Sequence, residues 1–179
     1  TRPARLVITA TTDTSSFGII SAEHPMKNKK WYFEDFPPGK RIDLPARTVS
    51  AEEIVEFASE FDPYPFHLDA EAAVEHGFDG LIASGWHLCA ISMRMMCDAF
   101  ILESSSQGSP GIEYCKWLKP VCAGDTLSGY CEVMDARTSS SRPGLGIGTW
   151  MLVVENQNGE KVMENRYKSF FLTREGAAA

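Results

Sequence analysis

Residues 86–102 read WHLCAISMRMMCDAFIL, and this stretch decides the fold class. A helix over it is apolar on nearly every side, and such a helix belongs in the middle of a core. A break rich in Ser, Gly and Pro follows, and then come four β-rich segments, at 112–118, 126–138, 147–156 and 161–173. Asn158-Gly159 between the last two is a hairpin signal. The sequence therefore predicts an α+β fold, with a buried helix packed on a mostly antiparallel sheet.

Two shorter helices are expected before the central one. The first opens with the capping box Ser50-x-x-Glu53, and apolar residues then recur at helical spacing, at Ile54, Phe57, Ala58 and Phe61. Two prolines end this helix near Asp62, because each pushes the residue before it toward extended geometry. A second helix is expected over 69–77, with Asp69 as its N-cap.

The length and composition indicate one globular domain. The chain has 179 residues, and its ten Phe, five Tyr and four Trp exclude general disorder. Residues 1–30 are mostly polar and show no period, so we expect a tail or extension there and a single domain over 31–179. The alternative for the first part of the chain is an N-terminal strand over 6–8.

Composition also excludes several classes of protein. The net charge of −7 argues against nucleic-acid binding, which needs a basic face. The five cysteines are odd in number and show no C-x-x-C spacing, so neither a disulfide framework nor a zinc site is expected. No apolar run is long enough to span a membrane, and no signal peptide is visible. We therefore expect a cytoplasmic protein with reduced cysteines and without a metal or cofactor.

The segment that follows the first helix is the strongest candidate for chemistry. Two prolines stiffen DPYPFH at 62–67, so the side chains of Asp62 and His67 should have fixed directions. A carboxylate and an imidazole aimed into one cleft suit proton transfer near neutral pH. The alternative is structural: Asp62 caps a turn and His67 is an ordinary half-buried histidine.

The start of the central helix is the second candidate. Gly85 would lie in the first turn, where backbone N–H groups lack helical partners and suit an oxyanion. The alternative is that Gly85 only lets the helix begin close to a strand. Ser84 is interpreted as the N-cap of this helix rather than as a nucleophile. His87, in the first turn, could lie near the cleft, but a structural role is favoured for it. Core filling, or the lining of an acyl pocket, is expected of Met93, Met95 and Met96.

Several motifs in order resemble the MaoC-like dehydratases, which are relatives of the (R)-specific enoyl-CoA hydratases. They are FAxxFDPYPFHLD at 57–69, GFxGLIASG at 77–85, KWLKPVxxGDTL at 116–127 and SSRP at 140–143. The resemblance implies the hotdog fold, in which a long central helix is wrapped by an antiparallel sheet. It also implies dimers that bind coenzyme A (CoA) along the subunit interface.

The resemblance further assigns roles to residues. It implies that Asp62 and His67 are the dyad that activates water and moves protons at C2 and C3 of a 2-enoyl thioester. Gly85 matches the glycine whose backbone N–H polarises the thioester carbonyl. Substrate binding is expected of Tyr64, Ser84, Trp86, His87, Lys116, Lys119 and Arg142.

Three positions depart from the family's pattern. Tyr64 stands where better-studied hydratases have Asn, Ser84 where many have His, and Met93 where some have Ser. Tyr64 cannot copy the paired hydrogen bonding of an amide, so this departure bears on the substrate class and the rate.

The leading hypothesis is reversible hydration of a 2-enoyl-CoA to an (R)-3-hydroxyacyl-CoA by a homodimer or higher homo-oligomer. The alternatives are an acyl-CoA thioesterase on the same fold and a non-catalytic acyl-CoA binding module. Residues 34–79 hold twelve acidic and three basic residues, a net charge of −9, whereas 110–179 hold eight of each. The CoA phosphates are therefore expected on later cations, for each of which a solvated surface role is the alternative: Lys116, Lys119, Arg137 and Arg142.

Overall fold

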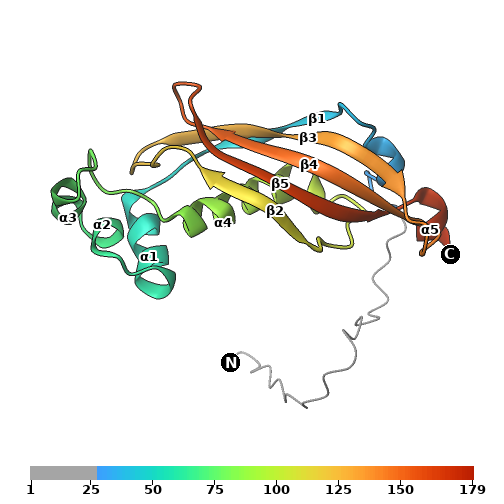
Figure 1. The fold of residues 1–179 in the computed structure, drawn as a ribbon, viewed down its shortest axis with the longest axis horizontal. Helices are drawn as coiled ribbons and strands as arrows, with labels where there is room; N and C mark the ends of the chain where they lie inside the picture. The colour runs from blue at the N-terminus through green and yellow to red at the C-terminus, as the bar shows by residue number, and fades with distance from the viewer. Residues whose placement is uncertain (1–27) are drawn as a thin grey trace, which may run out of the picture.

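A computed structural model describes residues 28–179, and an antiparallel sheet of five strands dominates it. The strands run in the order β1-β3-β4-β5-β2. Their bounds are β1 Arg41–Thr48, β2 Gly111–Trp117, β3 Thr126–Thr138, β4 Leu145–Glu155 and β5 Lys161–Leu172. The helix α4, Gly85–Met96, runs along one face of this sheet, which confirms the expected α+β hotdog architecture (Figure 1). The expected tail at 1–30 lies largely outside the described residues, and the alternative strand at 6–8 lies wholly outside them.

The sequence predicts four of the five strands to within two residues at each end. It does not predict β1, because this strand contains Pro45 and charged residues. Proline lacks the N–H that a central strand would donate, and it is tolerated here because β1 is an edge strand. The register with β3 also shifts between Leu44 and Arg47, at a bulge. The hairpin signal is confirmed, since Gly159 has the positive φ, 72°, that a tight turn between β4 and β5 requires.

The central helix is longer than α4 alone. It continues into a π-helical turn, η2, Cys97–Ile101. The expectation that it is buried on every side is wrong for a single chain, because Trp86 is 62% exposed and Met93 is 53% exposed. The sheet of one chain covers only one side of this helix (Figure 1). None of the helices within residues 28–179 is long and apolar enough to cross a membrane.

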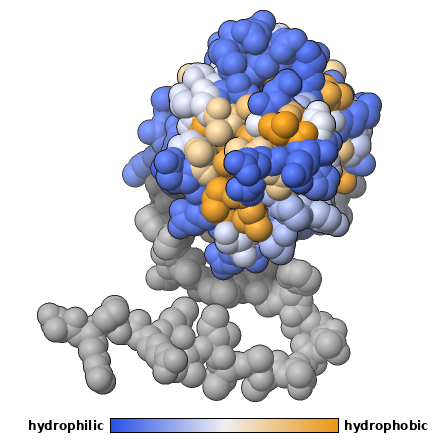
Figure 2. All heavy atoms as spheres, turned by 90° about the vertical axis from the view of Figure 1, so that its left-hand side faces the viewer, coloured by the Kyte–Doolittle hydropathy of each residue, from blue (hydrophilic) through white to orange (hydrophobic). Residues whose placement is uncertain are grey.

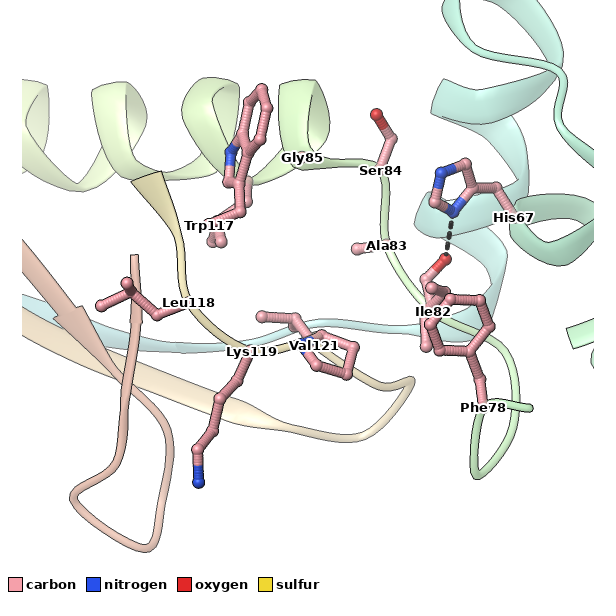
Figure 3. A pocket seen from close by; sticks show the side chains of 12 residues that line it. His67, Phe78, Ile82, Ala83, Ser84, Gly85, Trp117, Leu118, Lys119 and Val121 are labelled. Carbon is pink, nitrogen blue, oxygen red and sulfur yellow. Dashed lines mark hydrogen bonds between the residues drawn. The ribbon is translucent and has the colours of Figure 1, made fainter. Parts of the chain in front are cut away.

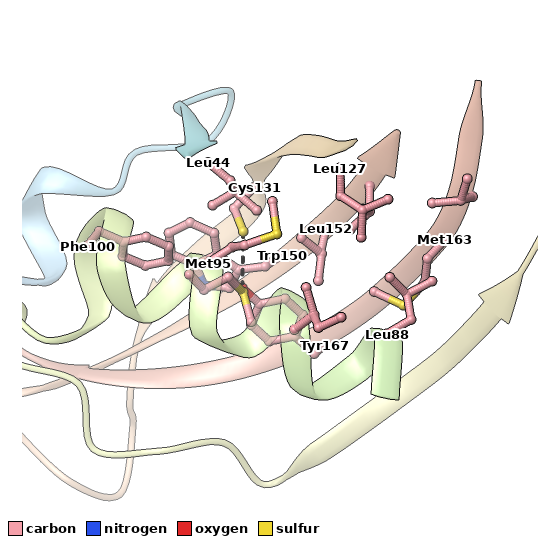
Figure 4. Close-up of a cluster of buried hydrophobic side chains, with 14 of the residues drawn as sticks. Leu44, Leu88, Met95, Phe100, Leu127, Cys131, Trp150, Leu152, Met163 and Tyr167 are labelled. Atoms are coloured by element: carbon pink, nitrogen blue, oxygen red, sulfur yellow. Dashed lines mark hydrogen bonds between the residues drawn. The ribbon is translucent and has the colours of Figure 1, made fainter. Parts of the chain in front are cut away.

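A cluster of aromatic rings holds the helix against the sheet. Trp150 of β4 is fully buried, and its ring centroid lies 5.5 Å from that of Phe100 in η2 and 5.9 Å from that of Phe171 in β5. Met95, Tyr167 and other apolar side chains of α4 and the sheet extend this core (Figure 4). Burial of several large side chains, each contributing about 1.5–3 kcal/mol, fixes the position of α4.

Three short helices gather beyond one end of the sheet, at the left of Figure 1: α1 Ala51–Phe61, α2 Pro65–Leu68 and α3 Ala70–Glu75. Seen from this end, the surface is mostly hydrophilic with a group of apolar side chains among the polar ones (Figure 2). The other end carries η1, Phe33–Asp35, and α5, Arg174–Ala178.

The helix signals in this region are confirmed with two corrections. Ser50 Oγ accepts a hydrogen bond from the Glu53 N–H, and the Ser50 N–H donates to Glu53 Oε1, so the capping box is present. Phe61, expected on the buried stripe, is instead 63% exposed, because it lies in the last turn of α1 at the end of the molecule. The turn α2 was not expected; Pro65 takes its first position, where a fixed φ favours a helix.

Candidate active site

Asp62 and His67 come together at the junction of α1 and α2. Asp62 is the C-cap of α1, and its Oδ2 lies 3.7 Å from His67 Nε2. This separation is longer than a direct hydrogen bond, so both groups can contact one oxygen atom placed between them. The His67 ring is almost fully buried, whereas the Asp62 side chain retains 19% exposure. The predicted pairing of these two side chains is therefore present in the structure.

A backbone carbonyl sets the tautomer of His67. His67 Nδ1 lies 2.9 Å from the carbonyl oxygen of Ile82. A carbonyl only accepts hydrogen bonds, so Nδ1 carries the hydrogen and donates it. In the neutral imidazole, Nε2 then keeps its lone pair, on the side that faces Asp62. His67 is thus arranged to accept a proton through Nε2.

Ser84 links the carboxylate to the start of the central helix. Its hydroxyl donates to Asp62 Oδ2 at 2.6 Å and accepts from the Trp86 N–H at 3.1 Å. The predicted N-cap is confirmed, and the same side chain also orients Asp62. Ser84 is 1% exposed, so this contact is shielded from solvent.

Gly85 begins α4 beneath an indole ring. No acceptor within residues 28–179 takes its backbone N–H, as expected for the first turn of a helix. A Cβ atom at Gly85 would lie 2.5 Å from Cε2 of Trp117, which no side chain tolerates without movement. The close packing that the sequence left as an alternative is therefore confirmed, and the N–H remains available to a ligand. Trp117 was not predicted as a site residue, although it lies in one of the quoted motifs.

One cavity connects the histidine to the helix start. It has a volume of about 280 Å³, and its lining includes His67, Gly85, Trp117, Phe78 and Lys119. Figure 3 shows Trp117 over Gly85 on one side and His67, bonded to Ile82, on the other. Asp62 does not line the cavity, but it contacts His67 and Ser84, which do. The cavity is mostly apolar with a few converging polar groups, which is typical of a small-molecule site.

Two exposed aromatic residues lie close to this cavity. The ring of Trp86 packs edge-on against Trp117, with the centroids 5.4 Å apart. Tyr64, between the two prolines, stacks on Phe66 at 5.3 Å. Neither residue belongs to the cavity lining, so their predicted contacts with substrate stay predictions.

The predicted cations divide into two groups. Lys119 lies at the cavity and pairs with Glu160, and Lys116 lies over the ring of Tyr114 at 4.7 Å. Arg142 lies instead in the loop between β3 and β4, where the neighbouring Gly144 accepts a hydrogen bond from Thr173 beside α5. This is the opposite end of the sheet from α1–α3, so a single chain does not bring Arg142 to His67 (Figure 1).

His87 lies apart from the His67 cavity. Its ring stacks on Phe57 with the centroids 4.7 Å apart, and it lines a separate hollow of about 270 Å³ together with Glu53 and Glu60. Nδ1 of His87 is buried without a hydrogen-bond partner within the described chain. Burial lowers the pKa of His87, so the side chain is neutral in the folded protein at neutral pH.

Acidification should therefore destabilise the fold through His87. Because its pKa is lowered on folding, the unfolded chain binds this proton more readily, and stability is lost as the pH falls below the unfolded pKa of about 6.5. We expect the melting temperature to fall less between about pH 7.5 and about pH 5 in His87→Phe than in the wild type. The exposed His76 gives the matched control, His76→Phe, which should keep the wild-type dependence. Equal dependence in His87→Phe would contradict this account.

Among residues 28–179, no group of three or more His, Cys, Asp or Glu side chains is arranged to hold a metal ion.

Comparison with known proteins identifies the family. The sequence model of the MaoC-like domain family matches residues 34–166 of this chain. The chain belongs to the MaoC-like domain family. A crystal structure of the MaoC-like dehydratase from Rhodospirillum rubrum is 37% identical, with a TM-score of 0.72, over 80% of this chain and 97% of that one. The uncharacterised protein YdeM of Bacillus subtilis is 33% identical over 131 residues, which are 73% of this chain and 92% of YdeM.

A more distant structure supports the fold of this MaoC-like chain. The (R)-hydratase from A. caviae is 21% identical, with a TM-score of 0.63, over 78% of this chain and 98% of that one. A likeness at this level shows the fold alone. Membership of the MaoC-like family supports hydratase or dehydratase activity.

Proposed function

We propose that this MaoC-like protein reversibly hydrates a 2-enoyl-CoA to an (R)-3-hydroxyacyl-CoA. The observation that carries the proposal is one cavity lined by His67 and by Gly85, whose N–H has no acceptor within residues 28–179, with Asp62 Oδ2 3.7 Å from the imidazole. Hydration needs a group that takes a proton from water and a donor for the thioester oxygen. The family's dehydratase members favour this chemistry over hydrolysis of the thioester.

The contacts suggest which group carries out each step of the hydration. The thioester oxygen accepts from the Gly85 N–H, and a water held between Asp62 and His67 attacks C3. As the new C–O bond forms, the dyad takes the proton from water and the double-bond electrons move onto the thioester oxygen as an enolate. The N-terminus of α4 stabilises this negative charge. The enolate then takes a proton at C2 from the dyad, so one water is consumed and the dyad regains its original protonation state.

The assay uses crotonyl-CoA and longer 2-enoyl-CoAs, following loss of the ultraviolet absorbance of the conjugated thioester. Loss of absorbance without release of free thiol supports the proposal. Thiol release, detected with a chromogenic disulfide, would instead identify a thioesterase. Thermal stabilisation by acyl-CoA without any turnover across the substrate series would identify a binding module.

The CoA phosphates are proposed to bind near Lys116 and Lys119. Lys119 lines the cavity two residues after β2 ends at Trp117, and Lys116 directly precedes Trp117 in the strand. We expect Lys119→Ala to raise KM for a CoA thioester by roughly threefold to tenfold. The same acyl group on pantetheine, which lacks the nucleotide, should show no such change. Lys40→Ala, a cation elsewhere on the surface, serves as the matched control, and an equal rise in KM there would contradict the assignment.

The protein is further proposed to act as a homodimer through the side that carries β2 and the uncovered face of α4. Large apolar side chains are exposed there, at Trp86, Met93, Ile112, Trp117 and Leu118. An exposed apolar edge strand normally pairs or is covered. Light scattering coupled to size-exclusion chromatography should give about twice the chain mass of 19.8 kDa. A monomer at all accessible concentrations would contradict the proposal.

A further inference from the structure

Two cysteines meet between the central helix and β2. Cys89 Sγ on α4 lies 3.8 Å from Cys115 Sγ on β2 and 4.0 Å from Met163 Sδ on β5. Among the five cysteines, all of which lie within residues 28–179 and are free thiols, no other pair shares a hydrogen bond. The hydration proposed above uses neither thiol. Two thiols in contact are the starting point for a disulfide bond, in which the sulfur atoms are about 2.05 Å apart.

The pair belongs to the same contact between α4 and β2 as the crowded start of the helix. Cys89 lies one turn beyond Gly85, about 6 Å along the helix axis, and side chains four residues apart share one face of a helix. Cys115 precedes Trp117 by two residues, so both side chains lie on the same face of β2. Trp117 lies over Gly85, and its ring leaves no room there for a Cβ atom (Figure 3). A bond between the two sulfur atoms therefore acts on the spacing at Gly85.

The helix and the strand differ in how easily they move. The central helix is held by the aromatic core around Trp150. In contrast, β2 is an edge strand that pairs only with β5 among residues 28–179, and its register is irregular between Ile112 and Tyr114. Closing the 3.8 Å separation of the sulfur atoms to about 2.05 Å should therefore draw β2 toward α4. This movement carries Trp117 toward Gly85 and narrows the cavity that both residues line.

The surroundings set the order in which the two sulfur atoms react. Burial, and then the nearby Cys89 sulfur, raise the pKa of Cys115 to about 12, so Cys115 keeps its proton at neutral pH. The thiolate is the form that attacks an oxidant, so the first attack falls to Cys89. Both side chains are half-buried rather than fully buried, so neither is closed off from an oxidant as small as hydrogen peroxide.

We propose that Cys89 and Cys115 are an oxidation site, at which a peroxide forms a reversible disulfide that links β2 to α4 and lowers turnover at the neighbouring cavity. The Cys89 sulfur attacks hydrogen peroxide, so an S–O bond forms, the O–O bond breaks and one water leaves. The Cys115 sulfur then attacks the Cys89 sulfur, so the S–S bond forms, the S–O bond breaks and a second water leaves with the Cys115 proton. Two thiols are oxidised, one peroxide is reduced to two waters, and a dithiol reductant reverses the change.

The test treats the full chain with an equimolar amount of hydrogen peroxide and maps the cysteines by mass spectrometry before and after addition of dithiothreitol. We expect a linked pair of peptides that contain Cys89 and Cys115, the loss of two of the five free thiols, and complete reversal by the reductant. The bond joins residues 26 apart in the chain, so the melting temperature should rise by roughly 5–10 °C. Dithiothreitol does not repair methionine sulfoxide, so oxidation of methionine does not imitate these changes.

Variants test the part assigned to each sulfur atom. In Cys115→Ser no link can form, and the oxidised Cys89 should be trapped as its sulfenic acid by dimedone. In Cys89→Ser, Cys115 should take up no dimedone. Cys97→Ser removes another half-buried thiol and is the matched control, so it should keep the link and the rise in melting temperature. A linked pair other than Cys89 and Cys115, or no linked pair at all, overturns the proposal.

The effect on turnover rests on the proposed hydration and is measured separately from the link. Oxidised wild type should hydrate crotonyl-CoA with a kcat about tenfold below that of the reduced protein, and dithiothreitol should restore it. Peroxide-treated Cys115→Ser should keep its own untreated rate. Unchanged turnover in fully linked protein overturns the effect on the cavity, although the link stands. If neither form hydrates crotonyl-CoA, thermal stabilisation by this thioester replaces turnover as the readout, and equal stabilisation of both forms overturns the effect.

Discussion

Replacing Asp62 with Asn should lower kcat/KM for a 2-enoyl-CoA by about 10³-fold, because a proton acceptor is lost while the shape of the side chain is kept. The amide oxygen of Asn can still accept from Ser84, which donates to Asp62 Oδ2 at 2.6 Å, so the fold around the junction should be retained. His67→Gln should cause a loss of similar size, since the lone pair at Nε2 disappears. Steady-state hydration of crotonyl-CoA, with melting temperatures measured in parallel, checks both variants.

Variants at Ser84, with a control at Asp69, test how the position of the Asp62 carboxylate affects turnover. Ser84→Ala keeps both reacting groups and frees the carboxylate, so kcat should fall by only about tenfold, and Ser84→Thr should recover most of it. Asp69→Asn is the matched control, because Asp69 also caps a helix nearby, accepting from the Ala72 N–H at 2.8 Å. It should change activity little. Wild-type turnover in Asp62→Asn would exclude the carboxylate from the chemistry.

Gly85→Ala should have the second largest effect, a fall in kcat of about 10²-fold. The new Cβ would lie 2.5 Å from the Trp117 ring, so either the indole or the first turn of α4 must move. Movement of the turn shifts the Gly85 N–H away from the thioester oxygen, where small displacements are costly. Overpacking should also destabilise the fold by about 1–3 kcal/mol, which thermal denaturation can measure.

A smaller side chain at position 117 tests whether crowding against Trp117 causes the effects of Gly85→Ala. In Gly85→Ala with Trp117→Leu, the space needed by the new Cβ is restored, so the melting temperature should return toward that of Trp117→Leu alone. Activity should recover in part, because the N–H returns to its position while one wall of the cavity is lost. A Gly85→Ala variant as active and as stable as the wild type would show that the close contact with Trp117 matters for neither activity nor stability.

Local patterns account for most of the fold. The apolar run at 86–102 predicts the central helix, and β-rich segments bounded by turn residues predict β2 to β5, because each signal depends on neighbours in sequence. β1 escapes prediction because Pro45 is compatible with a strand only at a sheet edge, and the sequence does not say which strand is at the edge.

The site was predictable only where its geometry is local. Asp62 and His67 are held by prolines within six residues, and the structure pairs them as expected. Two contacts that tune them join residues far apart in sequence: Ser84 to Asp62 over 22 residues, and His67 to the Ile82 carbonyl over 15. The contact of His67 with the Ile82 carbonyl involves a backbone atom that every residue has, so the residue type at position 82 does not predict it. The position of Trp117 over Gly85 likewise depends on how β2 docks against α4.

The two edge strands of the sheet, β1 and β2, differ in how well they can pair with a strand of another chain. At β1, a bulge between Leu44 and Arg47 and the missing N–H of Pro45 interrupt the ladder that an incoming strand would need. Within residues 28–179, no strand pairs with the outer side of β2, which carries the exposed side chains of Ile112 and Trp117. A sheet whose edge strand β2 can pair and whose edge strand β1 cannot is able to bind only one neighbouring molecule by strand pairing. If the proposed dimer pairs through β2, this pairing is self-limiting and gives a closed particle rather than a fibre.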